Sequence, residues 1–147
     1  MKHSMDEPIP PKPLDIANSL LSKDPFSLWM GIEVLEADLG YCKVSCTVSS
    51  EMTNGFGVTH GGIVFSLADT ALAFSAATFG KVALAIDNSI SFMQKTLPGQ
   101  KIIATSTVMH QTHKTAVFDI RVTRDDDDEL IAQMKGTVYR TGKDIEL

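Results

Sequence analysis

Residues 60–80 read HGGIVFSLADTALAFSAATFG, and this segment is the most informative about the fold. Twelve of the seventeen residues from Ile63 to Phe79 are apolar, and Gly80 is a natural helix end. The run is shorter than the ~20 residues that a membrane span needs, and an aspartate lies near its middle. We therefore predict a buried helix whose many alanines allow a sheet to approach closely.

Segments on both sides of this helix alternate between apolar and polar residues, as strands do. Two strands are expected before it, at Ile32–Leu39 and Tyr41–Val48, with a hairpin turn at Gly40 and then a loop at Ser49–Thr59. We expect a four-strand meander after it: Val82–Met93, Lys101–Met109, Thr115–Arg124 and Glu129–Thr141. This order predicts an α+β domain in which one antiparallel sheet wraps around one long central helix.

Two finer expectations concern the later strands. A turn is predicted at His110–Lys114 and another at Asp125–Asp128. In the strand that follows the helix, alternation predicts one shared face, formed by Val82, Leu84, Ile86, Ile90 and Phe92.

The N-terminal segment differs in composition from the rest of the chain. Residues 1–13 hold four of the six prolines and no apolar run, which predicts a flexible arm rather than a signal peptide or membrane span. A helical lead-in is expected at Leu14–Met30, interrupted at Asp24-Pro25. No internal repeat is visible, so residues 14–147 are expected to form a single domain.

Composition excludes several classes of protein. The chain has 147 residues, 44% hydrophobic and 21% charged, which is ordinary for one globular domain. Its net charge is −5, and no cluster of basic residues suggests a nucleic-acid partner. Cys42 and Cys46 lie four residues apart in one predicted strand, so their Cα atoms would be about 13 Å apart. That separation is too long for a disulfide, and we expect reduced thiols in a cytoplasmic protein.

Asp69 is the only ionisable side chain between His60 and Lys81. A carboxylate inside an apolar helix is costly unless it is paired or solvated. One interpretation is that it points off the buried face or is satisfied by a neighbouring Ser or Thr. The other is a general base or nucleophile in a cleft.

The start of the same helix offers a second candidate feature. Two glycines, Gly61 and Gly62, follow His60, and a helix start exposes free backbone N–H groups at the positive end of the helix dipole. Such groups can hold an anion or a developing oxyanion. A tight turn or close packing would also explain paired glycines.

Spacing constrains how the two features work together. Gly61 and Asp69 are eight residues apart, which is about 12 Å along a continuous helix. One carbonyl carbon cannot be reached from both within one chain. If they act together, the carboxylate and the N–H come from different subunits, with two helices antiparallel across a two-fold axis. Open sheet edges also favour a dimer.

The combination of Asn54-Gly55, Thr59-His60-Gly61-Gly62 and the segment from Phe65 to Ala71 resembles the hot-dog fold acyl-CoA thioesterases. Within that family it is most similar to the branch of the phenylacetic acid degradation thioesterases. Ser91-Phe92-Met93 and Pro98-Gly99 fit as well, and the resemblance covers Ile32 to Thr141.

The resemblance implies a role for each matching position. Asp69 would be the catalytic base or nucleophile, and the Gly61 N–H of the partner subunit would polarise the thioester carbonyl. Asn54 would orient water or the carboxylate, and His60 would support the oxyanion site. Substrate contacts are expected at Gly62, Thr70 and Lys114, the last near a CoA phosphate.

The resemblance also implies an assembly and a cofactor requirement. The family forms dimers and often tetramers, and it uses no metal or redox cofactor, because CoA is part of the substrate. His110 and His113 have no third partner at metal-site spacing. Related enzymes often carry a Ser or Thr where this chain has Ala85, flanked by Asp87 and Ser89.

The leading hypothesis is hydrolysis of an aryl- or short- to medium-chain acyl-CoA to the free acid and CoA. A second hypothesis is a hot-dog dehydratase or hydratase in which His60 and Asp69 form the acid–base pair. A third is a non-catalytic acyl-CoA-binding module, which Ala85 favours.

Overall fold

The computed structural model describes residues 9–147, so part of the predicted N-terminal arm lies outside the described residues. Two short helices come first, α1 (Pro13–Ser22) and α2 (Pro25–Trp29). Asp24 caps α2 by accepting a hydrogen bond from the Ser27 backbone N–H (3.0 Å). The interruption predicted at Asp24-Pro25 is confirmed.

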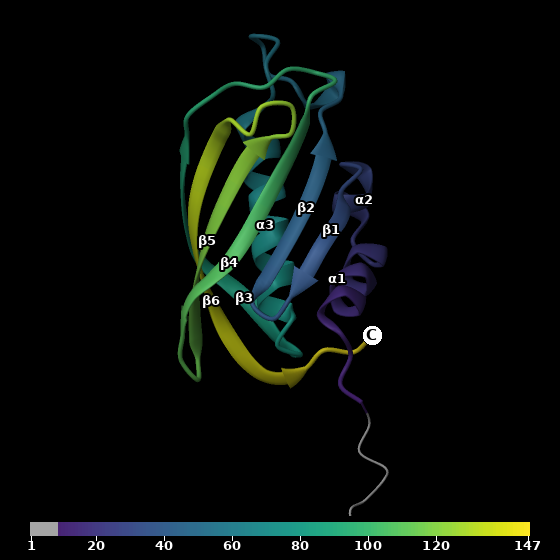
Figure 1. Ribbon diagram of the computed structural model, residues 1–147, viewed down its shortest axis with the longest axis vertical. Helices are drawn as coiled ribbons and strands as arrows, with labels where there is room; N and C mark the ends of the chain where they lie inside the picture. The colour runs from purple at the N-terminus through teal and green to yellow at the C-terminus, as the bar shows by residue number, and fades with distance from the viewer. Residues whose placement is uncertain (1–8) are drawn as a thin grey trace, which may run out of the picture.

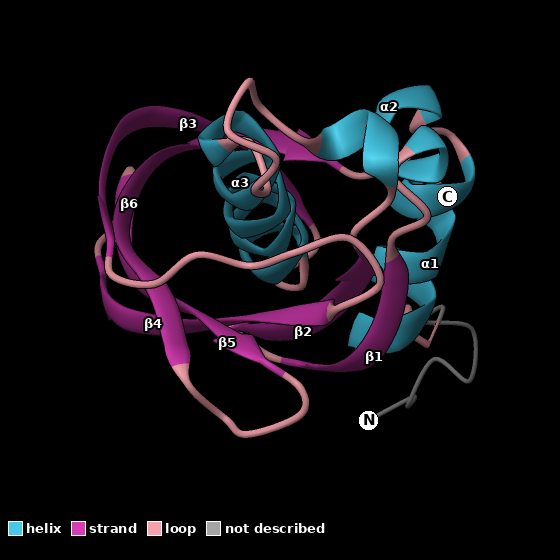
Figure 2. Cartoon of the chain, turned by 90° about the horizontal axis from the view of Figure 1, so that it is seen from above, coloured by secondary structure: helices cyan, strands magenta, loops and turns pink. Residues whose placement is uncertain are grey.

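The long helix α3 (Gly61–Ala77) forms the centre of the molecule. It begins at Gly61, the first of the two glycines expected at the helix start, where His60 caps it, and it runs without a break to Ala77, two residues before the predicted end at Phe79. Leu67, Ala68, Ala71 and Leu72 on this helix are completely buried. Burying one such leucine contributes about 1.5–3 kcal/mol, so this apolar face anchors the helix in the sheet. Figure 2 shows α3 inside the curve of the sheet.

Six antiparallel strands form one sheet in the order β1-β2-β4-β5-β6-β3. Their bounds are β1 (Glu33–Asp38), β2 (Tyr41–Thr47), β3 (Lys81–Phe92), β4 (Lys101–Gln111), β5 (Thr115–Arg124) and β6 (Leu130–Asp144). The sheet curls around α3, as Figures 1 and 2 show. This is the hot-dog arrangement that the resemblance implies.

The predicted four-strand meander is wrong in one respect. Only β4, β5 and β6 are consecutive neighbours, whereas β3 pairs with β6 at the far edge and β4 pairs with β2. Residues 93–100 carry the chain between the two sides and are held there by backbone hydrogen bonds to Val48 and Thr59. The β4 ladder also extends through His110 and Gln111, so the predicted turn after it is shorter.

The shared face predicted for β3 is also wrong. A β-bulge between Ala85 and Asp87 inserts one residue and reverses the alternation. Leu84 and Ile86 are therefore 58% and 60% exposed, whereas Ile90 packs against the core. Beyond the bulge, Asn88 faces α3.

Both cysteines are buried and free, as expected. Burial raises the pKa of the Cys42 thiol to about 12 and that of the Cys46 thiol to about 11. Within residues 9–147, none of the helices combines the length and hydropathy required to cross a bilayer.

Candidate active site

One stripe of α3 is not covered by the sheet. Gly62, Ser66, Asp69 and Ala73 recur about one turn apart, and none of them is buried. Figure 2 shows this helix flanked by β3 on one side and by α2 on the other. Asp69 therefore lies on a partly solvated face, which the interpretation as a base in a cleft requires.

Asp69 has one side-chain hydrogen bond within residues 9–147. The Nδ2 of Asn88 on β3 donates to its Oδ1 at 3.1 Å. Asn88 was not among the predicted site residues, because simple alternation along β3 does not reveal the bulge that turns this side chain toward α3. The structure thus places an amide beside Asp69, where the resemblance led us to expect a hydroxyl near Ala85.

The N-terminus of α3 leaves one backbone donor free. The N–H of Gly62 donates to His60 Nδ1 (2.8 Å), and the N–H groups of Ile63 and Val64 donate to the His60 carbonyl (2.9 and 3.5 Å). The Gly61 N–H has no acceptor within residues 9–147. Because Nδ1 accepts a hydrogen bond, a neutral His60 carries its proton on Nε2.

The two glycines differ in what a side chain would meet. A Cβ at Gly62 would lie 3.0 Å from His60 Nδ1. The absence of a side chain at Gly62 therefore allows the His60 ring to approach the helix end and cap it. A Cβ at Gly61 would lie 3.5 Å from the Phe92 ring, an ordinary contact distance. Packing therefore explains Gly62, whereas Gly61 stays open to a ligand.

Asn54 is held in the loop before α3. Its Oδ1 accepts hydrogen bonds from the backbone N–H groups of Phe56 (2.9 Å) and Val58 (3.4 Å), which forms an Asx-type turn. The Nδ2 of Asn54 has no acceptor within residues 9–147 and can donate to a bound water or carboxylate.

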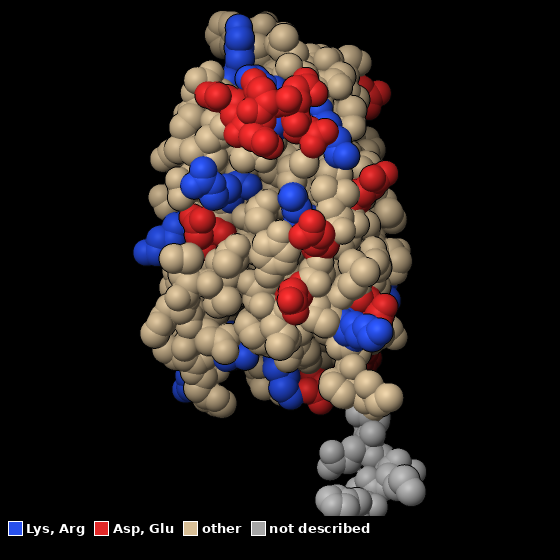
Figure 3. Space-filling view, in the orientation of Figure 1, with Lys and Arg blue, Asp and Glu red and all other residues tan. Residues whose placement is uncertain are grey.

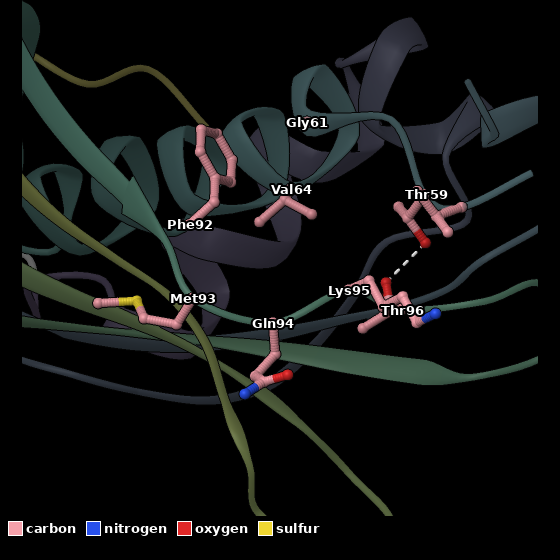
Figure 4. Close-up of a pocket in the computed structure, with 9 residues that line it drawn as sticks. Thr59, Gly61, Val64, Phe92, Met93, Gln94, Lys95 and Thr96 are labelled. Atoms are coloured by element: carbon pink, nitrogen blue, oxygen red, sulfur yellow. Dashed lines mark hydrogen bonds between the residues drawn. The ribbon is translucent and has the colours of Figure 1, made fainter. Parts of the chain in front are cut away.

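A cavity of about 270 Å³ adjoins the free N–H of Gly61. Figure 4 shows Phe92 beside Val64 of α3, and the hydrogen bond from the Thr96 hydroxyl to the Thr59 hydroxyl (2.6 Å) that joins the segment after β3 to the loop before α3. The walls of this cavity are therefore built by α3 and by the segment that follows β3.

A larger cavity of about 510 Å³ lies further along α3. Ala73 and Ala77 line it, one and two turns after Asp69, and Val82 and Ala83 of β3 form a second wall. The α1–α2 turn and the C-terminal segment close the far side, where Lys23 Nζ donates to the Glu146 carbonyl (3.2 Å). Apolar side chains make up most of the lining of this cavity, and Ala73 in its α3 wall shares the helix face that carries Asp69.

The predicted residues do not form one site within a single chain. Because α3 is continuous from Gly61 to Ala77, Gly61 and Asp69 lie about 12 Å apart along its axis. Thr70 is buried and donates to the Ser66 carbonyl (2.8 Å), close to Ser27 of α2. Contact of Thr70 with substrate stays a prediction.

Lys114 is exposed on the β4–β5 hairpin, at the end of the sheet remote from the start of α3 (Figure 1). On the face seen in Figure 3, acids gather over the β5–β6 turn, and the basic side chains are dispersed. Arg124 pairs with Asp127 in that turn (2.7 Å). The role of Lys114 at a phosphate stays a prediction.

Comparison with known proteins matches residues 56–131 to the thioesterase superfamily. A putative esterase of Archaeoglobus fulgidus is 42% identical over 111 residues, which are 76% of this chain and 71% of the relative. The acyl-coenzyme A thioesterase PaaI of Escherichia coli is 33% identical over 126 residues, 86% of this chain and 89% of the relative.

Solved structures agree with the sequence relatives. The structure of E. coli PaaI, from the phenylacetic acid degradation operon, matches with a TM-score of 0.88 at 32% identity. The match covers 91% of this chain and 96% of that one. The chain belongs to the thioesterase superfamily, which confirms the hot-dog, PaaI-like resemblance read from its sequence.

Proposed function

We propose that this protein hydrolyses an acyl-CoA thioester to a carboxylic acid and free CoA. The observation that carries the proposal is the pairing of two features on α3. The Gly61 N–H, at the positive end of the helix, has no acceptor among the described residues, and Asp69 presents a carboxylate on the uncovered stripe. The E. coli relative is named an acyl-coenzyme A thioesterase, which supports the choice of substrate.

In the proposed reaction, Asp69 takes a proton from a water molecule, whose oxygen attacks the thioester carbonyl carbon. The Gly61 N–H of the partner subunit stabilises the resulting oxyanion. Collapse of the intermediate breaks the carbon–sulfur bond, and the CoA thiolate receives the proton. Asn54 Nδ2 orients the water, and His60 holds the helix start in place.

Direct attack by Asp69, which gives a mixed anhydride, uses the same two groups. A single turnover in ¹⁸O-labelled water detects the anhydride route when water attacks the anhydride at its aspartyl carbon. Attack by water places the label only in the product acid, whereas hydrolysis of an anhydride at its aspartyl carbon leaves the label in Asp69.

The proposed site needs at least a homodimer with two α3 helices antiparallel. The outer edge of β3 has no partner strand within residues 9–147, and Leu84 and Ile86 on this strand are exposed. Pairing of two β3 edges would satisfy the backbone groups and cover both apolar side chains. We extend the proposal to a homotetramer of two such dimers in the cytoplasm.

We assign the acyl group to the cavity beyond Asp69. A chain that starts at the carbonyl carbon and follows α3 passes Ala73 and reaches Ala77. Its apolar walls fit an aryl or a short- to medium-chain acyl group. The reaction is proposed to need no metal or redox cofactor, because the carboxylate and the N–H supply the chemistry.

The hydrolase hypothesis is favoured over the dehydratase hypothesis by the contacts of His60. A dehydratase uses a histidine as an acid or base, whereas Nδ1 of His60 caps α3 by accepting from the Gly62 N–H, which leaves only Nε2 for proton transfer. The experiment is thiol release from a panel of aryl-, short- and medium-chain acyl-CoAs, with wild type and Asp69→Ala compared.

Activity in wild type that is lost in a folded Asp69→Ala variant would support the proposal. Equal activity in the variant would refute the assigned mechanism. Tight acyl-CoA binding without turnover would favour a binding module, and hydration of crotonyl-CoA would favour the dehydratase.

A further inference from the structure

We propose that Asn88 is a positioning residue, which orients the Asp69 carboxylate for catalysis. This inference rests on the proposed function. Asn88 Nδ2 donates to Asp69 Oδ1 at 3.1 Å, which leaves Oδ2 to accept the proton from water. Within residues 9–147, no other side chain donates a hydrogen bond to this carboxylate, so Asn88 supplies the one side-chain hydrogen bond that orients it.

The amide of Asn88 is held in one orientation. With Nδ2 toward Asp69, the Oδ1 of Asn88 is buried and has no hydrogen-bond partner within residues 9–147. The flipped amide would place two acceptor oxygens against each other. A buried acceptor without a partner costs free energy of folding. This unfavourable burial of Asn88 Oδ1 occurs at the position where the Nδ2 of the same amide donates to the Asp69 carboxylate.

The backbone of the neighbouring strands is shaped around this amide. The bulge between Ala85 and Asp87 turns Asn88 toward α3. Gly136 of β6 lies opposite Asn88 in the ladder, and a Cβ there would come within 3.0 Å of Asn88 Oδ1 and 2.6 Å of Leu72 Cδ2. Only glycine leaves room for both the amide and the leucine without a shift.

The hydrogen bond has a direct chemical consequence. A carboxylate held through one oxygen presents the lone pairs of the other in a fixed direction, which places the attacking water. Misplacement of a catalytic group by about 1 Å can lower the rate about 10²-fold. The effect falls on kcat, because Asn88 acts through Asp69 and not through CoA.

The test is Asn88→Leu, which is similar in volume and has no donor. We expect kcat to fall about 10²-fold, with KM and the affinity for a non-hydrolysable thioether analogue of acyl-CoA unchanged. The melting temperature should not fall, because the unpartnered Oδ1 is removed with the donor. Asn88→Ala serves as a second variant if the leucine does not fit.

A matched control is Ser89→Ala, the next residue on β3, which points away from α3 and should keep the wild-type kcat. Wild-type kcat in a folded Asn88 variant would overturn the inference. A loss of kcat that is matched by a lower melting temperature or by weaker analogue binding would overturn it as well, because the role would then be structural. Retained activity in Asp69→Ala would instead overturn the proposed function itself.

Discussion

The sharpest test of the proposed oxyanion donor is Gly61→Pro, because proline deletes one N–H and little else at this position. Gly61 is the first residue of α3, where proline is favoured since its missing N–H has no helical acceptor. The same chain already starts α1 and α2 with Pro13 and Pro25. His60 has φ −61° and ψ 134°, the extended conformation that a residue before proline prefers.

The expected magnitude follows from the contacts of this group. Because the Gly61 N–H has no acceptor within residues 9–147, its loss should leave the melting temperature unchanged. Removal of one oxyanion donor typically costs about 2.7–4 kcal/mol, or about 10²–10³-fold in kcat. The variant should therefore be folded, dimeric and nearly inactive.

The assay is thiol release from the best acyl-CoA of the panel, with kcat and KM determined separately. Gly61→Ala is the control for bulk, because it keeps the N–H and its Cβ would lie 3.5 Å from the Phe92 ring. We expect the alanine variant to be clearly faster than the proline variant. Equal rates in both would refute the assignment of this N–H as the donor, and a large loss of stability in the proline variant would show that the N–H already has a partner.

Three further predictions follow from other parts of the molecule. Ala77→Leu should fill the end of the larger cavity and shift kcat/KM toward shorter acyl groups, and an unchanged chain-length profile would place the acyl group elsewhere. Ile86→Lys puts a charge on the exposed face of β3 and should shift the sedimentation equilibrium from dimer to monomer, whereas an unaltered dimer would exclude this strand from the interface. Cys42 and Cys46 should not react with a thiol reagent at pH 8 in the native protein, because burial raises the pKa of their thiols to about 12 and about 11. Both should react after denaturation, and rapid native labelling would contradict their burial.

Local patterns in the sequence were sufficient to predict the helices and strands and to single out the candidate site residues. The apolar run after His60 predicted a buried helix, because so many adjacent apolar side chains require cover on nearly every face. Asp69 stood out as a charge inside that run, and the paired glycines marked a helix start. The resemblance to hot-dog thioesterases, confirmed by comparison, rests on the same residues.

The strand order of the sheet and the direction of the side chains along β3 could not be predicted from the sequence. Antiparallel strands of similar composition can pair in several orders. Which order forms depends on the position at which the chain leaves the end of α3 and enters the sheet. The pairing of β3 with β6 is therefore a property of the whole fold.

The bulge in β3 shows the same limit at the level of single residues. One inserted residue between Ala85 and Asp87 reverses every side chain beyond it, and alternation alone does not reveal it. Local periodicity and backbone chemistry were enough to predict the helix, its carboxylate and the glycines at its start. The contact between Asn88 and Asp69 could not be predicted, because it joins segments that are distant in sequence. Which of the two glycine N–H groups is free among the described residues also required the folded structure, because it depends on the orientation of the capping His60 side chain.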